Sequence, residues 1–436
     1  MGKEANEHPS ELVSGSSVAE AAAKAASQRL EELGIINGPA VLVLRNYLAD
    51  LGRGGGRGKR KAHGNRKIQF DMLLAALLLG AMSGVELSLR SIEKLSVDTR
   101  VEDLWNGRKL CRSTVSDMLS QFDLKLLMNL MRDLARHVPG MAQADRDPDL
   151  LKISKRIMAI DGSIFSMAAD VAWAISLTRK NGHKTAQVRF NALIDVLEFV
   201  PESAGVSGVG DGAEPEAYYD KLKPQTVYVA DRNFVNFEFM RRVIDAGGDF
   251  VVRLKTDTRF EPVEDRLLTP SDIDAGVVSD QVGRLPGSKG AAVLGGHPIR
   301  LVVVRAIDRT GQEQTIRLAT TLLDVSAAVI GKLYRHRWKI ELFFRWLKCV
   351  AGCRYLLSQS REGVEVQFYV AMIMALLSFL RHGRRLSKHT LGALEMVANG
   401  TMSLEGYAWY IARRERETQM EKIRRDKKKA AAAKKA

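Results

Sequence analysis

The chain has 436 residues, of which 46% are hydrophobic and 27% charged, so it is long enough for two or three domains with sizeable cores. Its 66 lysines and arginines outnumber 51 acidic residues and give a net charge of +15, which favours a nucleic-acid or anionic-membrane partner. Three cysteines are too few for a disulfide framework, and no apolar run reaches the roughly 18 residues that a membrane span needs.

Residues 1–67 have the composition of a flexible basic segment. The amino-terminal sequence MGKEANEHPS lacks the apolar core of a signal peptide, so we expect a reducing cytoplasm as the location. Residues 53–67 read RGGGRGKRKAHGNRK and place seven lysines and arginines among glycines. They do not form a phosphate-binding P-loop, because Arg60 follows Gly58 and Lys59 where a serine or threonine is required. A linker that follows the DNA backbone and a merely solvated loop both fit this composition.

The next segment is rich in helical patterns. Helices are expected over Ile68–Gly84, Val85–Leu95 and Arg112–Val138. Ser113 or Thr114 would cap the third of them. Short turns between such helices are typical of a helix-turn-helix DNA reader, but a plain helical bundle gives the same pattern.

From Lys152 onward, strand-like runs appear between helical ones. Asp161 lies inside RIMAIDGSIF (Arg156–Phe165), and Asp231 follows the apolar run of QTVYVADRNF (Gln225–Phe234). A carboxylate in a buried strand is costly unless it is paired or binds a metal ion. Further strands are expected over Thr185–Phe199 and Asp249–Lys255, helices over Ala213–Leu222, Phe237–Ala246 and Phe368–Leu380, and a loop over Gly205–Gly212.

One helical pattern, LYRHRWKIELFFRWLK over Leu333–Lys348, sets a single acid among basic residues. At about 100° per residue, its polar side chains fall within an arc of roughly 80°; they are Tyr334, Arg337, Glu341, Arg345 and Lys348. Asp324 and Ser326 are candidate N-caps for this helix. Such a face suits a polyanion with a metal ion beside it. A surface ladder of salt bridges without function has the same spacing.

The spacing Tyr-x2-Arg-x3-Glu-x6-Lys resembles the Tyr-Arg-Glu-Lys signature of a large family of bacterial insertion-sequence transposases. These are DDE enzymes, in which two aspartates and a glutamate hold divalent metal ions on an RNase H-like fold. Three further blocks resemble the family in the same order: Ile-Asp-Gly at 160–162, Ala-Asp-Arg-Asn-Phe at 230–234 and Arg-Leu-Lys at 253–255. The resemblance runs from about Lys152 to Leu380.

The resemblance implies an α/β fold with four regions. Residues 68–150 would form a helical DNA-binding domain. Residues 151–385 would form the RNase H-like catalytic domain, a mixed five-stranded sheet with helices, with a small β-subdomain inserted at about 257–320. Residues 386–436, which end in KKKAAAAKKA, would form a basic helical tail.

The resemblance also implies the chemistry. Asp161, Asp231 and Glu341 would hold two Mg²⁺ ions, for which Mn²⁺ can substitute, and these ions would activate the attacking oxygen and steady the leaving oxygen. The expected DNA contacts are Tyr334, Arg337, Arg345, Lys348, Arg253 and Lys255. The enzyme would cleave double-stranded DNA at the ends of an insertion sequence and join the 3′-hydroxyls to target DNA, as a homodimer in the synaptic complex. It would need no membrane and would associate with the nucleoid.

Two rival functions share these features. A decayed relative could bind DNA without cleaving it, although the intact acids and the full Tyr-Arg-Glu-Lys set argue against this. An RNase H-like nuclease could hydrolyse DNA without joining strands.

Overall fold

The structure is a computed structural model of the full chain. It describes residues 10–33, 36, 39–52, 68–82, 87–137, 148–167, 171–178, 184–197, 201–286, 293–294, 296–307, 311–349, 353, 356–382, 393, 396 and 401–433. The chain divides into two compact units. The helical unit comprises Met1–His137, Val350–Cys353 and Val370–Ala436, and the sheet unit comprises Val138–Cys349 and Arg354–Tyr369. The basic residues 53–67 lie outside the described residues.

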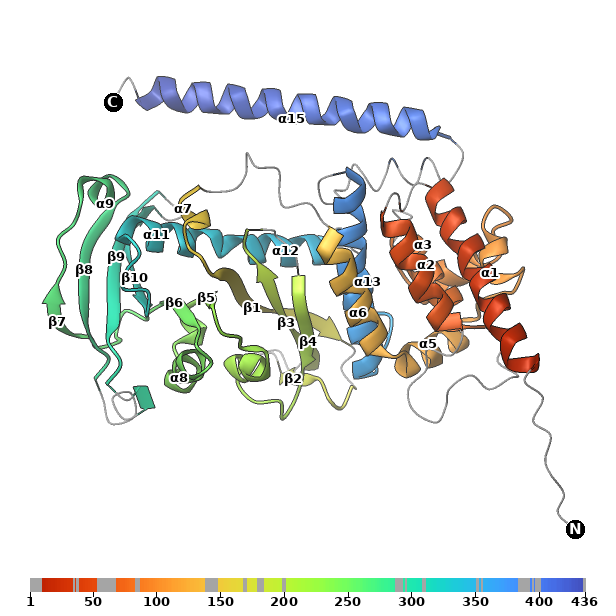
Figure 1. The fold of residues 1–436 in the computed structure, drawn as a ribbon, viewed down its shortest axis with the longest axis horizontal. Coiled ribbons are helices and arrows are strands. Elements are labelled where there is room, and N and C mark those ends of the chain that lie inside the picture. The colour runs from red at the N-terminus through yellow and green to blue at the C-terminus, as the bar shows by residue number, and fades with distance from the viewer. Residues whose placement is uncertain are drawn as a thin grey trace, which may run out of the picture. The chain divides into compact units, whose positions relative to one another are not determined.

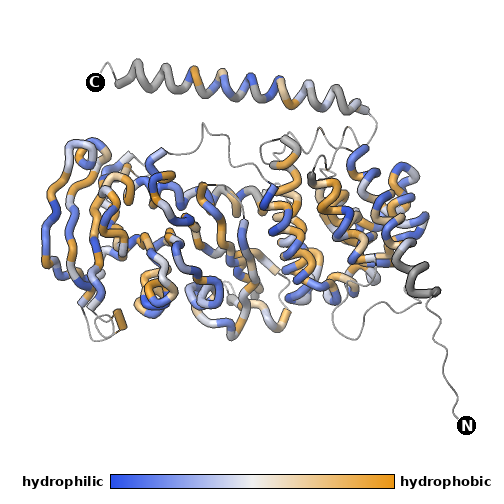
Figure 2. Tube along the Cα trace, in the orientation of Figure 1, coloured by the Kyte–Doolittle hydropathy of each residue, from blue (hydrophilic) through white to orange (hydrophobic). Residues whose placement is uncertain are grey.

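The helical unit is built around an apolar helix. Its helices are α1 (Ser10–Glu32), α2 (Pro39–Gly52), α3 (Phe70–Met82), α4 (Leu89–Leu95), the 3-10 helix η2 (Glu102–Trp105), α5 (Arg112–Gln121), α6 (Leu124–His137) and α15 (Leu404–Ala433). Helix α13 (Arg361–His382) begins in the sheet unit and continues into the helical unit. Figure 2 shows α3 as hydrophobic along most of its length, and its residues 70–79 are buried. Such a helix must be covered by others, because no face of it is polar enough for water. Helices α1 and α2 pack on it, so the prediction of a flexible segment over residues 1–67 is wrong for Ser10–Glu32 and Pro39–Gly52.

The expected single helix over Arg112–Val138 is two helices, so that prediction is wrong. The chain breaks at Phe122, whose ψ of 139° is extended. Phe122 is buried and meets the ring of Phe70 edge-on at 5.2 Å. The Asp123 carboxylate then accepts a hydrogen bond from the Lys125 amide at 3.0 Å and starts the next helix.

The predicted cap of this region is also wrong. The N-cap of α5 is Cys111 rather than Ser113 or Thr114, and its side chain makes no capping hydrogen bond within the described chain. Burial of an aromatic ring and a local Asp turn decide these boundaries, and helical periodicity reports neither.

The sheet unit contains one ten-stranded mixed sheet within its described residues. Its strands are β1 (Arg156–Met167), β2 (Ile175–Thr178), β3 (Lys184–Asp195), β4 (Pro201–Ser207), β5 (Thr226–Ala230), β6 (Asp249–Arg253), β7 (Glu261–Asp265), β8 (Val277–Arg284), β9 (Ile299–Ile307) and β10 (Glu313–Thr320). The order is β2-β3-β1-β5-β6-β10-β9-β8-β7, with β4 also paired to β3. The loop expected over Gly205–Gly212 is wrong at its start, because β4 extends to Ser207 and Gly205 pairs with Asn191 of β3.

The centre of the sheet is parallel and its neighbours are antiparallel. Strand β1 pairs with β5, and β5 with β6, in parallel. Strand β3 is antiparallel to β1, and β4 is antiparallel to β3. Parallel strands need a crossover between them. The 3-10 helix η4 (Glu214–Lys221) lies between β4 and β5, η5 (Arg232–Phe234) follows β5, and α8 (Phe237–Asp245) leads into β6.

The four strands from the region 257–320 extend this sheet instead of forming a separate one. Strand β10 pairs antiparallel with β6, with Leu318 opposite Arg253. Strands β9, β8 and β7 then follow outward, with α9 (Pro270–Asp274) between β7 and β8. The sheet is therefore larger than the five strands expected from the sequence.

Alternation along β1 separates two layers of packing. Met158 and Ile160 face a buried cluster that includes Tyr218 of η4 and Phe239 of α8. Residues of odd number, such as Phe165, face the other side. Helices α11 (Ala327–His336) and α12 (Trp338–Cys349) pack there, α11 on β5 and β6 and α12 on β1. Figure 1 shows α11 and α12 end to end along one side of the sheet, with α8 on the other.

An aromatic cluster fixes α12 to the sheet. Phe190 of β3 stacks on Phe368 at 4.0 Å and meets Phe344 of α12 at 6.2 Å. Phe165 of β1 meets Phe368 edge-on at 4.8 Å. Buried aromatic pairs of this kind each contribute about 0.5–1.5 kcal/mol beyond area burial. The position of α12 on β1 is thus specified by packing three residues away from Glu341. None of the described helices is both long and apolar enough to cross a membrane.

Candidate functional site

Three of the expected site residues, two acids and one base, lie at one level across the sheet. Ala159 of β1 is opposite Val229 of β5, and Val229 is opposite Val251 of β6. Two residues further along each strand are Asp161, Asp231 and Arg253. Because side chains alternate with a period of two, residues in these positions share the face of the sheet on which α12 lies. Asp161, in the middle of β1, therefore lies level with the carboxyl ends of β5 and β6, where Asp231 and Arg253 are found.

The helix expected over Leu333–Lys348 is interrupted at Arg337, so the prediction of one continuous helix is wrong. Helix α11 ends at His336, and α12 begins at Trp338. The amide of Arg337 donates to the Tyr334 carbonyl at 3.1 Å, three residues back, which is 3-10 geometry. Ser326 is the N-cap of α11, but within the described chain its side chain makes no capping bond. Asp272 of α9 accepts from the Ala328 amide at 2.8 Å instead.

Arg337 joins two of the expected acids. Its Nη1 lies 3.3 Å from Asp161 Oδ2, and its Nη2 lies 2.5 Å from Glu341 Oε1. The Arg337 side chain is nine-tenths buried, and its Nε has no hydrogen-bond partner among the described residues. The guanidinium also lies 5.6 Å from the ring centre of Tyr334, which is itself buried. The Arg337 fork thus compensates two carboxylates that come from a strand and a helix far apart in sequence.

Asp161 lies in an environment that disfavours its negative charge. Burial raises the pKa of Asp161 to about 7, while the Arg337 guanidinium lowers it, and the charges of Asp231 and Glu214 raise it again. The Gly162 amide donates to Asp161 Oδ1 at 2.9 Å. Asp231, for its part, accepts at Oδ1 from the Asn233 amide at 2.7 Å. One buried arginine therefore faces an excess of acidic groups.

The remaining expected DNA contacts lie at several distinct places. Lys348 Nζ lies 4.9 Å from the ring centre of Phe165, on the face of β1 that bears Asp161. Arg345 and Lys255 are exposed, and Arg253 is half-buried at the end of β6. The structure therefore brings Arg337 to Asp161 and Glu341, with Tyr334 against the guanidinium, and Asp231 lies close enough to Asp161 for its charge to raise the pKa of Asp161. Lys348 of α12 contacts Phe165. Phe165 lies four residues beyond Asp161 along β1, roughly 13 Å at 3.3 Å per residue.

Two residues of η4 that lie near Asp161 were not expected from the sequence. Tyr218 is fully buried, and its hydroxyl donates to the main-chain carbonyl of Asp161 at 2.6 Å. Glu214 lies close enough for its charge to raise the pKa of Asp161. The local signal was an acidic residue before Pro215 at the start of a helical stretch, which is common at helix starts and points to no partner.

The donor set fits a divalent cation of the hard, oxygen-binding kind. The described residues form no group of three acidic, histidine or cysteine side chains close enough to hold a metal ion as they stand, and Arg337 lies between Asp161 and Glu341. The nearby ligands are carboxylate oxygens, which Mg²⁺ and Mn²⁺ prefer. In addition, Glu214 Oε1 is buried and has no hydrogen-bond partner in the described chain. Excess negative charge and an unsatisfied buried oxygen are what a bound cation would relieve.

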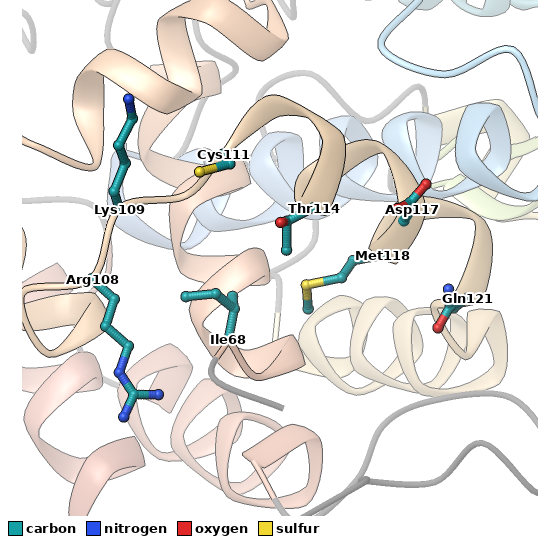
Figure 3. Close-up of a pocket in the computed structure, with 8 residues that line it drawn as sticks. All are labelled: Ile68, Arg108, Lys109, Cys111, Thr114, Asp117, Met118 and Gln121. Carbon is teal, nitrogen blue, oxygen red and sulfur yellow. The ribbon is translucent and has the colours of Figure 1, made fainter. Parts of the chain in front are cut away.

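The helical unit has a pocket of its own, of about 810 Å³. Figure 3 shows its lining: Arg108 and Lys109 come from the stretch before α5, Ile68 lies opposite Met118, and the remaining residues are Cys111, Thr114, Asp117 and Gln121. The lining thus combines apolar side chains with two cations next to the amino end of α5. Basic side chains and a helix amino terminus both favour anions.

Comparisons with known proteins show which family the chain belongs to. The family described as "Transposase DDE domain" matches residues 152–377, just over half of the chain. "Putative transposase y4zB" of Sinorhizobium fredii is 30% identical over 173 residues, which is 40% of this chain and 47% of that protein. "Probable transposase for insertion sequence element IS5377" of Geobacillus stearothermophilus is 30% identical over 224 residues, 51% of this chain and 56% of that protein.

The chain spans about half the length of the curated relatives it matches. A cryo-EM structure of the piggyBac transposase synaptic complex with hairpin DNA aligns with 90% of this chain and 81% of its own, at 10% identity and a TM-score of 0.40. That likeness is too weak to establish a shared fold. The family match covers Asp161, Asp231 and Glu341 together, and the chain belongs to the transposase DDE domain family.

Proposed function

We propose that this chain is a transposase of the Tyr-Arg-Glu-Lys type, which binds the ends of an insertion sequence, cleaves the DNA and joins the 3′-hydroxyl ends to target DNA. The observation that carries the proposal is the meeting of Asp161 and Glu341 on Arg337, next to Asp231 at the carboxyl ends of parallel strands. Carboxyl ends of parallel strands are the usual place for ligands in α/β sheets.

The sheet order supports an RNase H-like catalytic domain within residues 151–385. The five strands β4-β3-β1-β5-β6 place an antiparallel meander beside two strands parallel to β1. This is the arrangement that an RNase H-like fold requires. Counted along the chain, the first of the five strands, β1, carries Asp161, and the fourth, β5, is followed by Asp231. Strands β7 to β10 would be the family's insertion at about 257–320. Residues 68–150 would bind the element ends, and 386–436 would form the basic tail.

The mechanism assigns separate tasks to the acids and the bases. Asp161, Asp231 and Glu341 would hold a pair of divalent cations, which supply an activated oxygen nucleophile and neutralise charge at phosphorus when bound. With its carboxylate partners neutralised, the Arg337 fork would be able to take two oxygens of a DNA phosphate. The buried Tyr334 ring would keep the guanidinium in place.

The other basic residues would hold the DNA backbone. Lys348 of α12, which packs on Phe165 on the face of β1 that bears Asp161, would contact a phosphate beside the scissile bond. Exposed Arg345 and Lys255 would act with Arg253 in the same way. Double-stranded DNA, both element ends and target, would be the partner, and a homodimer would hold two ends in the synaptic complex. Mg²⁺ would be the cofactor, with Mn²⁺ able to replace it, in a nucleoid-associated enzyme.

The first experiment separates chemistry from binding. The DNA flanking the gene is searched for short inverted repeats, and a duplex containing one is titrated with Mg²⁺ and Mn²⁺. Glu341→Gln keeps the shape of the side chain and removes its charge, so cleavage should fall by at least about a hundredfold while DNA affinity changes little. Lys348→Ala should cost on the order of a hundredfold in rate through misplacement of the DNA end.

Lys332→Ala is the matched control, because it removes an equal charge from α11, where Lys332 pairs with Asp149. Normal cleavage by Glu341→Gln would contradict the proposed site. Products hydrolysed but never joined to target DNA would favour a nuclease, and binding without any cleavage by the unaltered chain would favour a DNA-binding relative.

A further inference from the structure

Helix η4 is anchored beneath the strand position that bears Asp161. It packs on the face of the sheet opposite α12, where Tyr218 joins the buried cluster with Met158 and Ile160. The Tyr218 hydroxyl reaches the Asp161 carbonyl at 2.6 Å and the Ala192 carbonyl at 3.3 Å. Strand β5 ends at residue 230, so β1 lacks that neighbour beyond Asp161. The Tyr218 hydroxyl donates to the Asp161 carbonyl at this position, and this hydrogen bond fixes η4 against the edge of β1.

Glu214, the first residue of η4, uses the space left by a glycine. A Cβ built on Gly162 would lie 2.4 Å from Glu214 Oε1, closer than any real contact. The backbone of Gly162 does not have the positive φ that would itself require glycine. The glycine after Asp161 therefore serves to admit the Glu214 carboxylate to the strand edge beside Asp161.

The surroundings of Glu214 compensate it poorly. Burial raises the pKa of Glu214, the nearby Arg189 lowers it and the charge of Asp231 raises it again. Arg189 is already committed, since its Nε donates to Asn191 at 3.0 Å and its Nη2 lies 3.5 Å from the Gly212 carbonyl.

The backbone near Glu214 does not complete the compensation either. The Gly162 amide lowers the pKa of both Glu214 and Asp161, but its hydrogen bond goes to Asp161 Oδ1. Glu214 Oε1 is left buried with no hydrogen-bond partner among the described residues. An unsatisfied buried oxygen costs on the order of 1–3 kcal/mol, and more when it is charged.

We propose that Glu214 is a fourth carboxylate of the cation site, which reaches Asp161 and Asp231 from the face of the sheet opposite α12. The inference rests on the function proposed above, because that function places cations at Asp161 and Asp231. A divalent cation beside these acids turns the unsatisfied Glu214 oxygen into a favourable ligand or an outer partner of a bound water. Gly162 contributes to the same site, since a side chain at this position would keep the Glu214 carboxylate away from Asp161.

The test measures cation binding without any turnover. Mn²⁺ alone is titrated into the full chain, in the absence of DNA, and free Mn²⁺ is followed by electron paramagnetic resonance. Glu214→Gln should weaken Mn²⁺ binding by about 10–100-fold. Asp220→Asn is the matched control, because Asp220 lies on the same helix with its side chain 80% exposed, and Mn²⁺ binding should stay within twofold. A Glu214→Gln affinity within twofold of the unaltered chain would overturn the inference.

Thermal melting separates this role from a purely structural one. In EDTA, Glu214→Gln should melt at the same temperature as the unaltered chain or higher, because it removes a poorly compensated charge. In Mn²⁺ it should gain less stability than the unaltered chain. A glutamate that merely holds η4 in place would lower the melting temperature in both conditions, and that result would contradict the inference.

A double-mutant cycle tests the role of the glycine. Gly162→Ala should weaken Mn²⁺ binding strongly in the unaltered chain but much less in Glu214→Ala, because the clash with Glu214 is then gone. Equal, additive losses in both backgrounds would contradict the inference.

Asp231→Asn distinguishes a failure of the Glu214 proposal from a failure of the proposed cation site. If Asp231→Asn loses Mn²⁺ binding while Glu214→Gln keeps it, only the fourth carboxylate is wrong. If neither substitution changes Mn²⁺ binding, or the unaltered chain binds no Mn²⁺, the proposed cation site itself fails.

Discussion

In the metal-free protein, the charge on Asp161 should make the sheet unit less stable as pH rises. The pKa of Asp161 is about 7 in the folded chain against an ordinary value of 3.8, with burial as the largest cause. A group whose pKa is raised on folding adds stability below its unfolded pKa and loses it as pH rises through the folded value. Asp161→Asn removes the charge at every pH, while its side-chain oxygen can still accept from the Gly162 amide. The stability of Asp161→Asn relative to the unaltered chain should therefore rise from pH 5 to pH 8.

The expected magnitude follows from the two pKa values. At 1.36 kcal/mol per pKa unit, the interval from 3.8 to about 7 corresponds to at most about 4 kcal/mol. Roughly 2–3 kcal/mol of this is lost between pH 5 and pH 8. Domains of 150–250 residues shift their melting temperature by about 2–4 °C per kcal/mol. The melting temperature of Asp161→Asn relative to the unaltered chain should thus rise by several degrees over this interval.

The assay is calorimetry or fluorescence melting in EDTA at pH 5, 6, 7 and 8. Glu202→Gln provides a control of opposite sign. Burial favours its neutral form, but hydrogen bonds from Arg156 and Lys223 outweigh burial and lower the pKa of Glu202. That stability is present above the unfolded pKa of Glu202, so its loss should destabilise the protein at pH 8. Parallel melting curves for Asp161→Asn and the unaltered chain at all four pH values would refute the reasoning.

Three further predictions concern other parts of the chain. Tyr218→Phe removes the hydroxyl that donates to the Asp161 carbonyl, so melting in EDTA should report a loss of about 1–3 kcal/mol. Asp280→Ala leaves the fully buried Arg300 without its carboxylate partner, so denaturant unfolding should report a loss of about 3–5 kcal/mol. Removal of residues 413–436, which hold eleven lysines and arginines, should flatten the slope of log DNA affinity against log salt.

Less buried counterparts provide the controls. Tyr219→Phe alters a neighbour whose ring lies against Arg242, and Asp265→Ala alters an exposed carboxylate on the adjacent strand β7; each should change stability by less than about 0.5 kcal/mol. Losses equal to those of the buried partners would mean that burial does not set the cost. An unchanged salt slope would mean that the removed tail does not touch DNA.

The strands that carry the aspartates could be predicted because their signals are local. Apolar runs of four to six residues end on Asp161 and Asp231, and both are strands in the structure. The register that aligns these two residues could not be read from either run, since it depends on pairing between segments 70 positions apart. The same limit applies to the sheet beyond β6, where a small inserted β-subdomain was expected but its addition to the central sheet was not.

The interruption at Arg337 shows where periodicity fails. Nothing in LYRHRWKIELFFRWLK breaks a helix, because the stretch holds neither glycine nor proline. The 3-10 turn accompanies a contact between Arg337 and Asp161, which lies 176 residues earlier in the chain. Glu214 was not expected for a related reason. Its neighbours Gly162 and Asp231 lie far away in the sequence, and no pattern within η4 points to them.

Arg337 gives the site a consistent charge balance in both of the states that the proposed function requires. A buried guanidinium is tolerated only when it is paired, and here Asp161 and Glu341 pair with it. Two acids with one base still leave the carboxylates of Asp231 and Glu214 to repel Asp161, which is the imbalance that a cation would remove. Once cations neutralise the acids, the guanidinium needs a new anionic partner, and a DNA phosphate is the partner with matching geometry. Under the proposed function, the same arginine would therefore stabilise the empty site and bind DNA in the loaded one. This explains why an arginine, with its two-ended fork, suits position 337 better than a lysine.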